Sequence, residues 1–193
     1  MKHITKYNIL YLVWILVIFG ASLIYGVSSG HAGAAIIGLV IIILFPTMIQ
    51  GFFWHDFFLG RRYNRKGDWD QAIRCFHNFL LRLKKHPWLK HLIFLRWSRY
   101  TNNIEAMTHN NIALALINRG EVEMAEKSCQ AALESDPLYP VPFFHLALIE
   151  KIKDNESRAR ELWQKSASLG YDNVGFENLK LLADSLKKQM EKK

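Results

Sequence analysis

The distribution of charged residues divides the chain into two parts. Between Tyr7 and His55 there is no Lys, Arg, Asp or Glu, whereas charges recur every few positions from Asp56 to the end. Half of the 193 residues are hydrophobic, yet the mean hydropathy is only −0.01. This segregation predicts an apolar N-terminal part, residues 1–55, followed by one domain of ordinary size over residues 56–193.

The uncharged part contains two apolar runs separated by a short turn of small residues. The runs, about 8–26 and 34–54, each have the roughly 20 residues needed to cross a hydrocarbon core, so we expect a transmembrane hairpin. A cleaved signal peptide is the alternative for the first run, because its start is basic and small residues follow it. An apolar stretch longer than the ~7–15 residues of a signal core favours an uncleaved span.

Positive charges flank the two runs but are missing from the turn between them. Lys2 and Lys6 precede the first run, and four bases follow the second run within residues 61–66. The positive-inside rule then predicts a multi-pass protein of the bacterial inner (cytoplasmic) membrane, with both termini in the cytoplasm. Because neither run carries a charge, we expect an anchor and not an ion or proton pathway.

A short pattern recurs three times after the apolar part. The segments GDWDQA (67–72), GEVEMA (120–125) and DNESRA (154–159) each begin with Gly or Asp and end with Ala. A bulky or soft residue, Phe76, Cys129 or Trp163, follows four positions later. The second and third segments are 34 residues apart, and such a period predicts stacked helical repeats.

These residues resemble the tetratricopeptide repeat family, whose repeat has Leu-Gly-x-x-Tyr on its first helix, Ala-x-x-x-Phe on its second helix and a closing Pro. The matching residues are Leu59, Gly60, Tyr63, Ala72 and Phe76 in the first unit, Ala113, Ala125 and Pro137 in the second, and Ala147 and Ala159 in the third. The early Trp of the family is replaced by Asp56, His109 and Phe143.

The predicted fold class is therefore all-α, a two-helix transmembrane hairpin followed by a short helical solenoid similar to tetratricopeptide repeats. The resemblance implies repeats over about 53–87, 106–139 and 140–173, with an insertion at about 88–105. A cap helix is expected over 174–190, because Leu179, Leu182, Leu186 and Met190 recur at helical spacing.

Basic residues are concentrated in the part of the domain nearest the apolar runs. Residues 57–103 have a net charge of +9, and residues 104–193 have a net charge of −2. Juxtamembrane bases attract anionic lipid, so we expect a lipid-facing set of basic and aromatic residues, with packing on the first repeat as the open alternative. No recognition motif supports a nucleic-acid partner. The set consists of Lys84, Lys85, Trp88, Lys90, Arg96, Trp97 and Arg99.

No pattern in the sequence indicates catalysis. The eight histidines are scattered, Cys75 and Cys129 are expected to be buried thiols, and no phosphate loop or nucleophile elbow is present. We therefore expect a protein that is not an enzyme and has no metal, cofactor or small-molecule substrate.

The resemblance implies a concave groove, lined by the first helix of each repeat, that binds a protein or peptide partner. Amides and arginines on one such face suit an extended peptide. A chaperone-tail clamp is not expected, because Phe57, Arg61 and His145 occupy three of its sites, although Asn111 matches. The groove would consist of Arg61, Asn64, Arg65, Asn110, Asn111, Asn118, Phe144, Leu148 and Lys151.

Together these features predict a membrane-anchored interaction scaffold that recruits or assembles a partner at the cytoplasmic membrane face. The alternative is a non-catalytic subunit of a membrane enzyme or transporter complex that contacts this complex through the hairpin.

Overall fold

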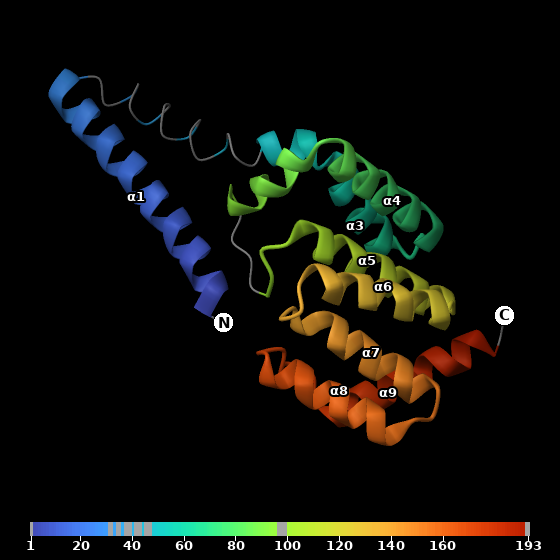
Figure 1. The fold of residues 1–193 in the computed structure, drawn as a ribbon. Helices are drawn as coiled ribbons and strands as arrows, with labels where there is room; N and C mark the ends of the chain where they lie inside the picture. The colour runs from blue at the N-terminus through green and yellow to red at the C-terminus, as the bar shows by residue number, and fades with distance from the viewer. Residues whose placement is uncertain are drawn as a thin grey trace.

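The computed structural model describes residues 2–30, 33, 36, 40, 44, 48–95 and 100–191, which form helices joined by turns and loops. The elements are α1 (Lys2–Ser29), α3 (His55–Lys66), α4 (Trp69–Lys85), the 3-10 helix η1 (Pro87–Leu95), α5 (Ile104–Arg119), α6 (Val122–Ser135), α7 (Pro140–Ile152), α8 (Glu156–Ser168) and α9 (Phe176–Met190). From α3 onward, the pairs α3–α4, α5–α6 and α7–α8 stack side by side (Figure 1). The prediction of an all-α solenoid is therefore confirmed.

The turn inside each pair has the same backbone conformation. Gly67, Gly120 and Asp154 have φ values of 77°, 93° and 63°, in the left-handed region that ends many helices. In each turn the next N–H donates to the carbonyl five residues earlier, for example Glu121 N to Leu116 O at 2.9 Å. The repeated sequence segments are thus repeated turns, and they bring each second helix back antiparallel to the first.

Small residues lie where the paired helices approach each other. Ala72, Ala125 and Ala159 are fully buried, and Gly60 lies against the ring of Phe76. A Cβ built on Gly60 would lie 2.8 Å from that ring, so only glycine fits there without movement. Alternation of small and large side chains therefore lets α3 and α4 pack closely.

Helix α9 packs against α7 at the end of the stack (Figure 1). Its buried side chains are Phe176, Leu179, Ala183 and Leu186. The expected apolar face included Leu182, but this side chain is 41 % exposed. At that turn of α9 the buried residue is therefore Ala183, one position after the expected Leu182.

Helix α1 lies beside the solenoid and approaches it at η1 (Figure 1). Its apolar side chains include exposed ones, such as Leu16, Val17 and Ile24. A membrane span needs about 20 consecutive apolar residues in one helix. Among the residues that the structure describes, no helix combines the length and the apolar character needed to cross a membrane.

This finding contradicts the predicted transmembrane hairpin. It also contradicts the predicted location, a multi-pass protein of the bacterial inner membrane with both termini in the cytoplasm. Most of the second expected span, 34–54, lies outside the described residues. The alternative function through a membrane hairpin loses its basis for the same reason.

Candidate partner-binding groove

The first helices of the pairs, α3, α5 and α7, carry the residues expected to line the groove. On α3, Asn64 bridges two units, because its Nδ2 donates to the backbone oxygen of Asn111 at 3.1 Å. Arg65 is exposed and Arg61 is half-buried. Asn64 therefore lies at the junction with α5, and Arg61 and Arg65 lie within one helical turn of it on α3.

Arg61 lies close enough to the Tyr139 phenol to affect its pKa. Burial raises the pKa of the Tyr139 phenol, Tyr171 and Asp136 add to this rise, and Arg61 opposes it. Because Tyr139 immediately precedes α7, Arg61 is within electrostatic reach of the start of the third pair.

The amides of α5 differ in their surroundings. Asn111 and Asn118 are half-buried, and each Nδ2 donates to a carbonyl one turn earlier, at 2.7 Å and 2.8 Å. Asn110 is 5 % exposed, and its buried Oδ1 has no partner within the described residues. The Oδ1 atoms of Asn111 and Asn118 accept no bond from a described group, so they can accept one from a ligand.

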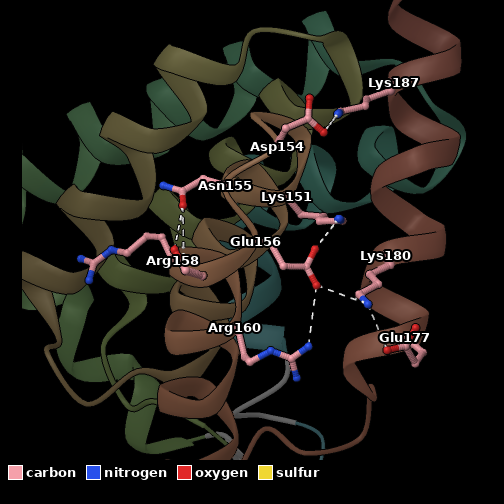
Figure 2. A network of polar contacts seen from close by, with 10 residues as sticks. Lys151, Asp154, Asn155, Glu156, Arg158, Arg160, Glu177, Lys180 and Lys187 are labelled. Atoms are coloured by element: carbon pink, nitrogen blue, oxygen red, sulfur yellow. Dashed lines mark hydrogen bonds and ion pairs between the residues drawn. The ribbon is translucent and has the colours of Figure 1, made fainter.

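The three groove residues expected on α7 are buried or paired with other side chains of the chain. Phe144 and Leu148 are buried, and the Phe144 ring lies 5.2 Å from the Tyr171 ring. Lys151 forms an ion pair with Glu156 at 2.5 Å, as Figure 2 shows. Of the nine expected groove residues, those of α3 and α5 therefore lie near one another, whereas those of α7 are covered or paired.

A short segment before α5 packs on Tyr171, whose ring lies against Phe144 of α7. The Tyr100 ring lies 5.3 Å from the Tyr171 ring, and its hydroxyl accepts from Asn173 Nδ2 at 3.0 Å. The Thr101 hydroxyl donates to Asp136 at 2.5 Å, and Asn103 Nδ2 donates to a backbone oxygen at the end of α6. Residues 100–103 therefore connect the inserted segment to the loops after α6 and α8.

Sequence reasoning did not identify this tyrosine contact. One signal was available, because Tyr171 stands where the repeat pattern has its closing Pro. A Tyr at that position can cover the neighbouring Phe144, whereas a Pro has no ring large enough to do so.

Part of the basic and aromatic set packs on the protein. Trp88 is 49 % exposed and has its ring 5.0 Å from that of Phe53, while Lys90 forms an ion pair with Glu105. Lys84 and Lys85 are exposed. The remaining members of the set, Arg96, Trp97 and Arg99, lie outside the described residues.

The described part of the insertion is held by buried groups of η1. Leu89 and Ile93 are buried in the core, and the Leu89 backbone oxygen accepts from Trp54 Nε1 at 3.2 Å. Gln50 Nε2 donates to the Leu92 oxygen at 2.7 Å. Of the two alternatives for this region, packing on the first unit is the one observed for η1.

Burial lowers the pKa of the His145 imidazole to about 4 and raises the pKa of the Cys129 thiol. Cys129 is buried as expected, whereas Cys75 is only partly buried, so the prediction of a buried thiol is wrong for Cys75. Within the described ranges, no three His, Cys, Asp or Glu side chains lie close enough to hold a metal ion. The expected absence of a metal or cofactor stays a prediction.

Residues 57–87, which comprise most of α3, the first turn and α4, match the sequence model of the tetratricopeptide repeat family. The first helix pair is thus supported as a tetratricopeptide repeat. No curated protein matches the chain. Tetratricopeptide repeats generally bind protein partners, so the family match indicates a role in protein–protein interaction.

Proposed function

We propose that this chain is a non-catalytic scaffold that recruits a protein partner through the surface shared by α3 and α5. The proposal rests on one observation above all. Two adjacent first helices present guanidinium and amide groups, on Arg61, Arg65, Asn111 and Asn118, whose hydrogen-bonding capacity the described residues do not use up.

An extended peptide fits these groups chemically. Its backbone N–H groups can donate to the Oδ1 atoms of Asn111 and Asn118, and its carbonyl and carboxylate oxygens can accept from Arg61 and Arg65. Guanidinium groups are suited to carboxylates because they can donate two parallel bonds.

The bound segment would be short. Phe144 and Leu148 are buried and Lys151 is paired, so α7 offers a ligand little of the expected surface. We therefore propose a site that extends over the first two helix pairs and ends at the contact between Tyr100 and Tyr171.

The test is recovery of native complexes with an affinity-tagged full-length chain, quantified by mass spectrometry. Replacing both Asn111 and Asn118 with Ala removes two side-chain acceptors. It retains the bond from Asn64, which is made to a backbone oxygen. If each lost bond costs about 1 kcal/mol, recovery should fall by more than about tenfold.

The matched control is Asn178→Ala on the exposed side of α9, which should leave recovery unchanged. Loss of the same partner from both variants, or from neither, would count against the groove as the binding surface.

A further inference from the structure

The first helix pair carries a group of cations without acidic partners. Arg61, Arg62, Arg65 and Lys66 lie within six residues on α3, and none of them forms an ion pair with any residue that the structure describes. Arg61 and Arg65 are four residues apart, as are Arg62 and Lys66, so each pair places like charges on neighbouring turns. Such pairs are unfavourable in an isolated helix.

Cations at the other end of the solenoid are mostly paired. Figure 2 shows Lys151, Arg160 and Lys180 converging on Glu156, at 2.5, 3.7 and 3.3 Å. Lys187 pairs with Asp154 in the same region. The third helix pair and α9 therefore neutralise these cations internally, whereas α3 leaves its four cations available.

The helix dipole accounts for only part of the α3 group. Cations in the last turn of a helix interact favourably with its carbonyl ends, and Arg65 and Lys66 lie in that turn. Arg61 lies before it, more than one turn from the end of α3. A structural role at the helix end therefore does not explain why Arg61 is a cation.

We infer that the partner segment of the proposed function is acidic, and that its side-chain carboxylates bind Arg61 and Arg65. Arg61 and Arg65 are one turn apart on α3 and flank Asn64, whose side chain contacts α5, so two carboxylates of one extended segment can reach them. This inference rests on the proposed function and specifies the class of its ligand.

The geometry favours side-chain carboxylates over a terminal one. A terminal clamp needs cations from several repeats around one carboxylate, but Phe57 is apolar and fully buried at one such position. His145 is buried and neutral at another, and Lys151 on α7 is already paired. Among the expected groove residues that the structure describes, the cations without an ion pair thus lie on α3, where they can bind successive acidic side chains.

The experiment measures binding of the full-length chain to a fluorescent synthetic 12-residue peptide of alternating Glu and Ala, by anisotropy. Peptides with Gln in place of Glu, and with a free or an amidated C-terminus, are compared. We expect the Glu peptide to bind and the Gln peptide not to bind. The free-acid and amidated forms should agree within about twofold, and binding should weaken as salt shortens the Debye length from ~10 Å at 0.1 M to ~3 Å at 1 M.

Matched variants separate a site from the overall charge. The variant with Arg61→Gln and Arg65→Gln should lose at least about tenfold in affinity. The variant with Lys127→Gln and Lys165→Gln has the same net charge and removes two exposed cations of α6 and α8 that have no ion pair within the described residues. Its affinity should change by less than about twofold.

Several results would overturn the inference. One is an equal loss in both variants, and another is binding that requires the free C-terminus. A third is failure of the Glu peptide to bind while anionic vesicles or single-stranded RNA bind through Arg61 and Arg65. If the arginine variant keeps its native partner while the Asn111 and Asn118 variant loses it, the proposed function stands and the acidic ligand is rejected.

Discussion

Gly60 offers the sharpest test of how the first helix pair is packed. A glycine inside a helix normally makes the helix about 1 kcal/mol less stable than an alanine would. On this ground alone, Gly60→Ala would be expected to stabilise α3. Here a Cβ would lie 2.8–2.9 Å from three carbons of the Phe76 ring. That ring is fully buried and packs edge-on against Phe57, with centroids 6.0 Å apart, so it cannot easily move aside.

Overpacking of this kind costs about 1–3 kcal/mol, which outweighs the gain in helix propensity. We expect Gly60→Ala to lower the free energy of unfolding by about 1 kcal/mol and the melting temperature by about 2–4 °C. The measurement is thermal and urea unfolding of the full-length chain, followed by circular dichroism. Gly51→Ala is the matched control, because nothing lies within 4 Å of a Cβ there, and it should be neutral or stabilising.

A second substitution shows whether Phe76 is the cause. Phe76→Leu gives the new methyl group space, so the cost of Gly60→Ala should be smaller in that background than alone. If Gly60→Ala stabilises the protein as much as Gly51→Ala does, the close contact between α3 and α4 is refuted.

Three further predictions concern the core. Ala125→Leu should lower the free energy of unfolding by about 1–3 kcal/mol in urea melts, because Ala125 is fully buried on α6, and an unchanged stability would place α6 in another register. Trp54→Phe removes the N–H group that donates to the Leu89 oxygen and should lower the free energy of unfolding by about 1–3 kcal/mol in the same assay. An unchanged free energy of unfolding would show that this hydrogen bond does not hold η1 on the first helix pair. The pKa of His145 is lowered to about 4 in the folded protein, so the unfolded state binds more protons between pH 6.5 and 4. The contribution of neutral His145 to the free energy of unfolding is therefore complete above about pH 6.5 and is lost as pH falls towards 4. Stability should drop by about 3 kcal/mol over this window, and His145→Gln should lack that part of the pH dependence.

The repeats could be predicted from sequence because their signals are local. The turn residues Gly67, Gly120 and Asp154 share a backbone conformation that few residues other than Gly, Asn and Asp adopt readily. The buried alanines follow each turn at a fixed distance, so the pattern also gives the side of the helix that is buried. These constraints depend on residues within a few turns of each other.

The extent of the groove depends on contacts between distant residues and could not be predicted in the same way. Phe144 is buried because the ring of Tyr171 lies against it and Tyr100 packs on that ring. Lys151 is unavailable because Glu156, on the next helix, pairs with it. A repeat pattern gives the position of a residue on its helix, but not which loop lies over it.

The apolar N-terminal part shows another limit of a pattern-based prediction. Hydropathy and flanking charge predicted two spans, whereas the described residues contain no helix long and apolar enough for one. An apolar run in the sequence gives the composition of a segment. It does not show whether that segment forms one helix long enough to cross a membrane.

The central claim is that the surface of α3 and α5 binds one segment of one partner protein. Site-specific photo-crosslinking in native cells tests it most directly, with a benzophenone side chain placed at Arg62 or Leu114, which adjoin the proposed binding residues in the groove, or at exposed Gln130 on the second helix of the next pair. The account predicts that both groove positions crosslink to a single continuous stretch of one protein and that Gln130 does not. Crosslinks to that protein mainly from Gln130, or groove crosslinks spread evenly over unrelated proteins, would contradict it.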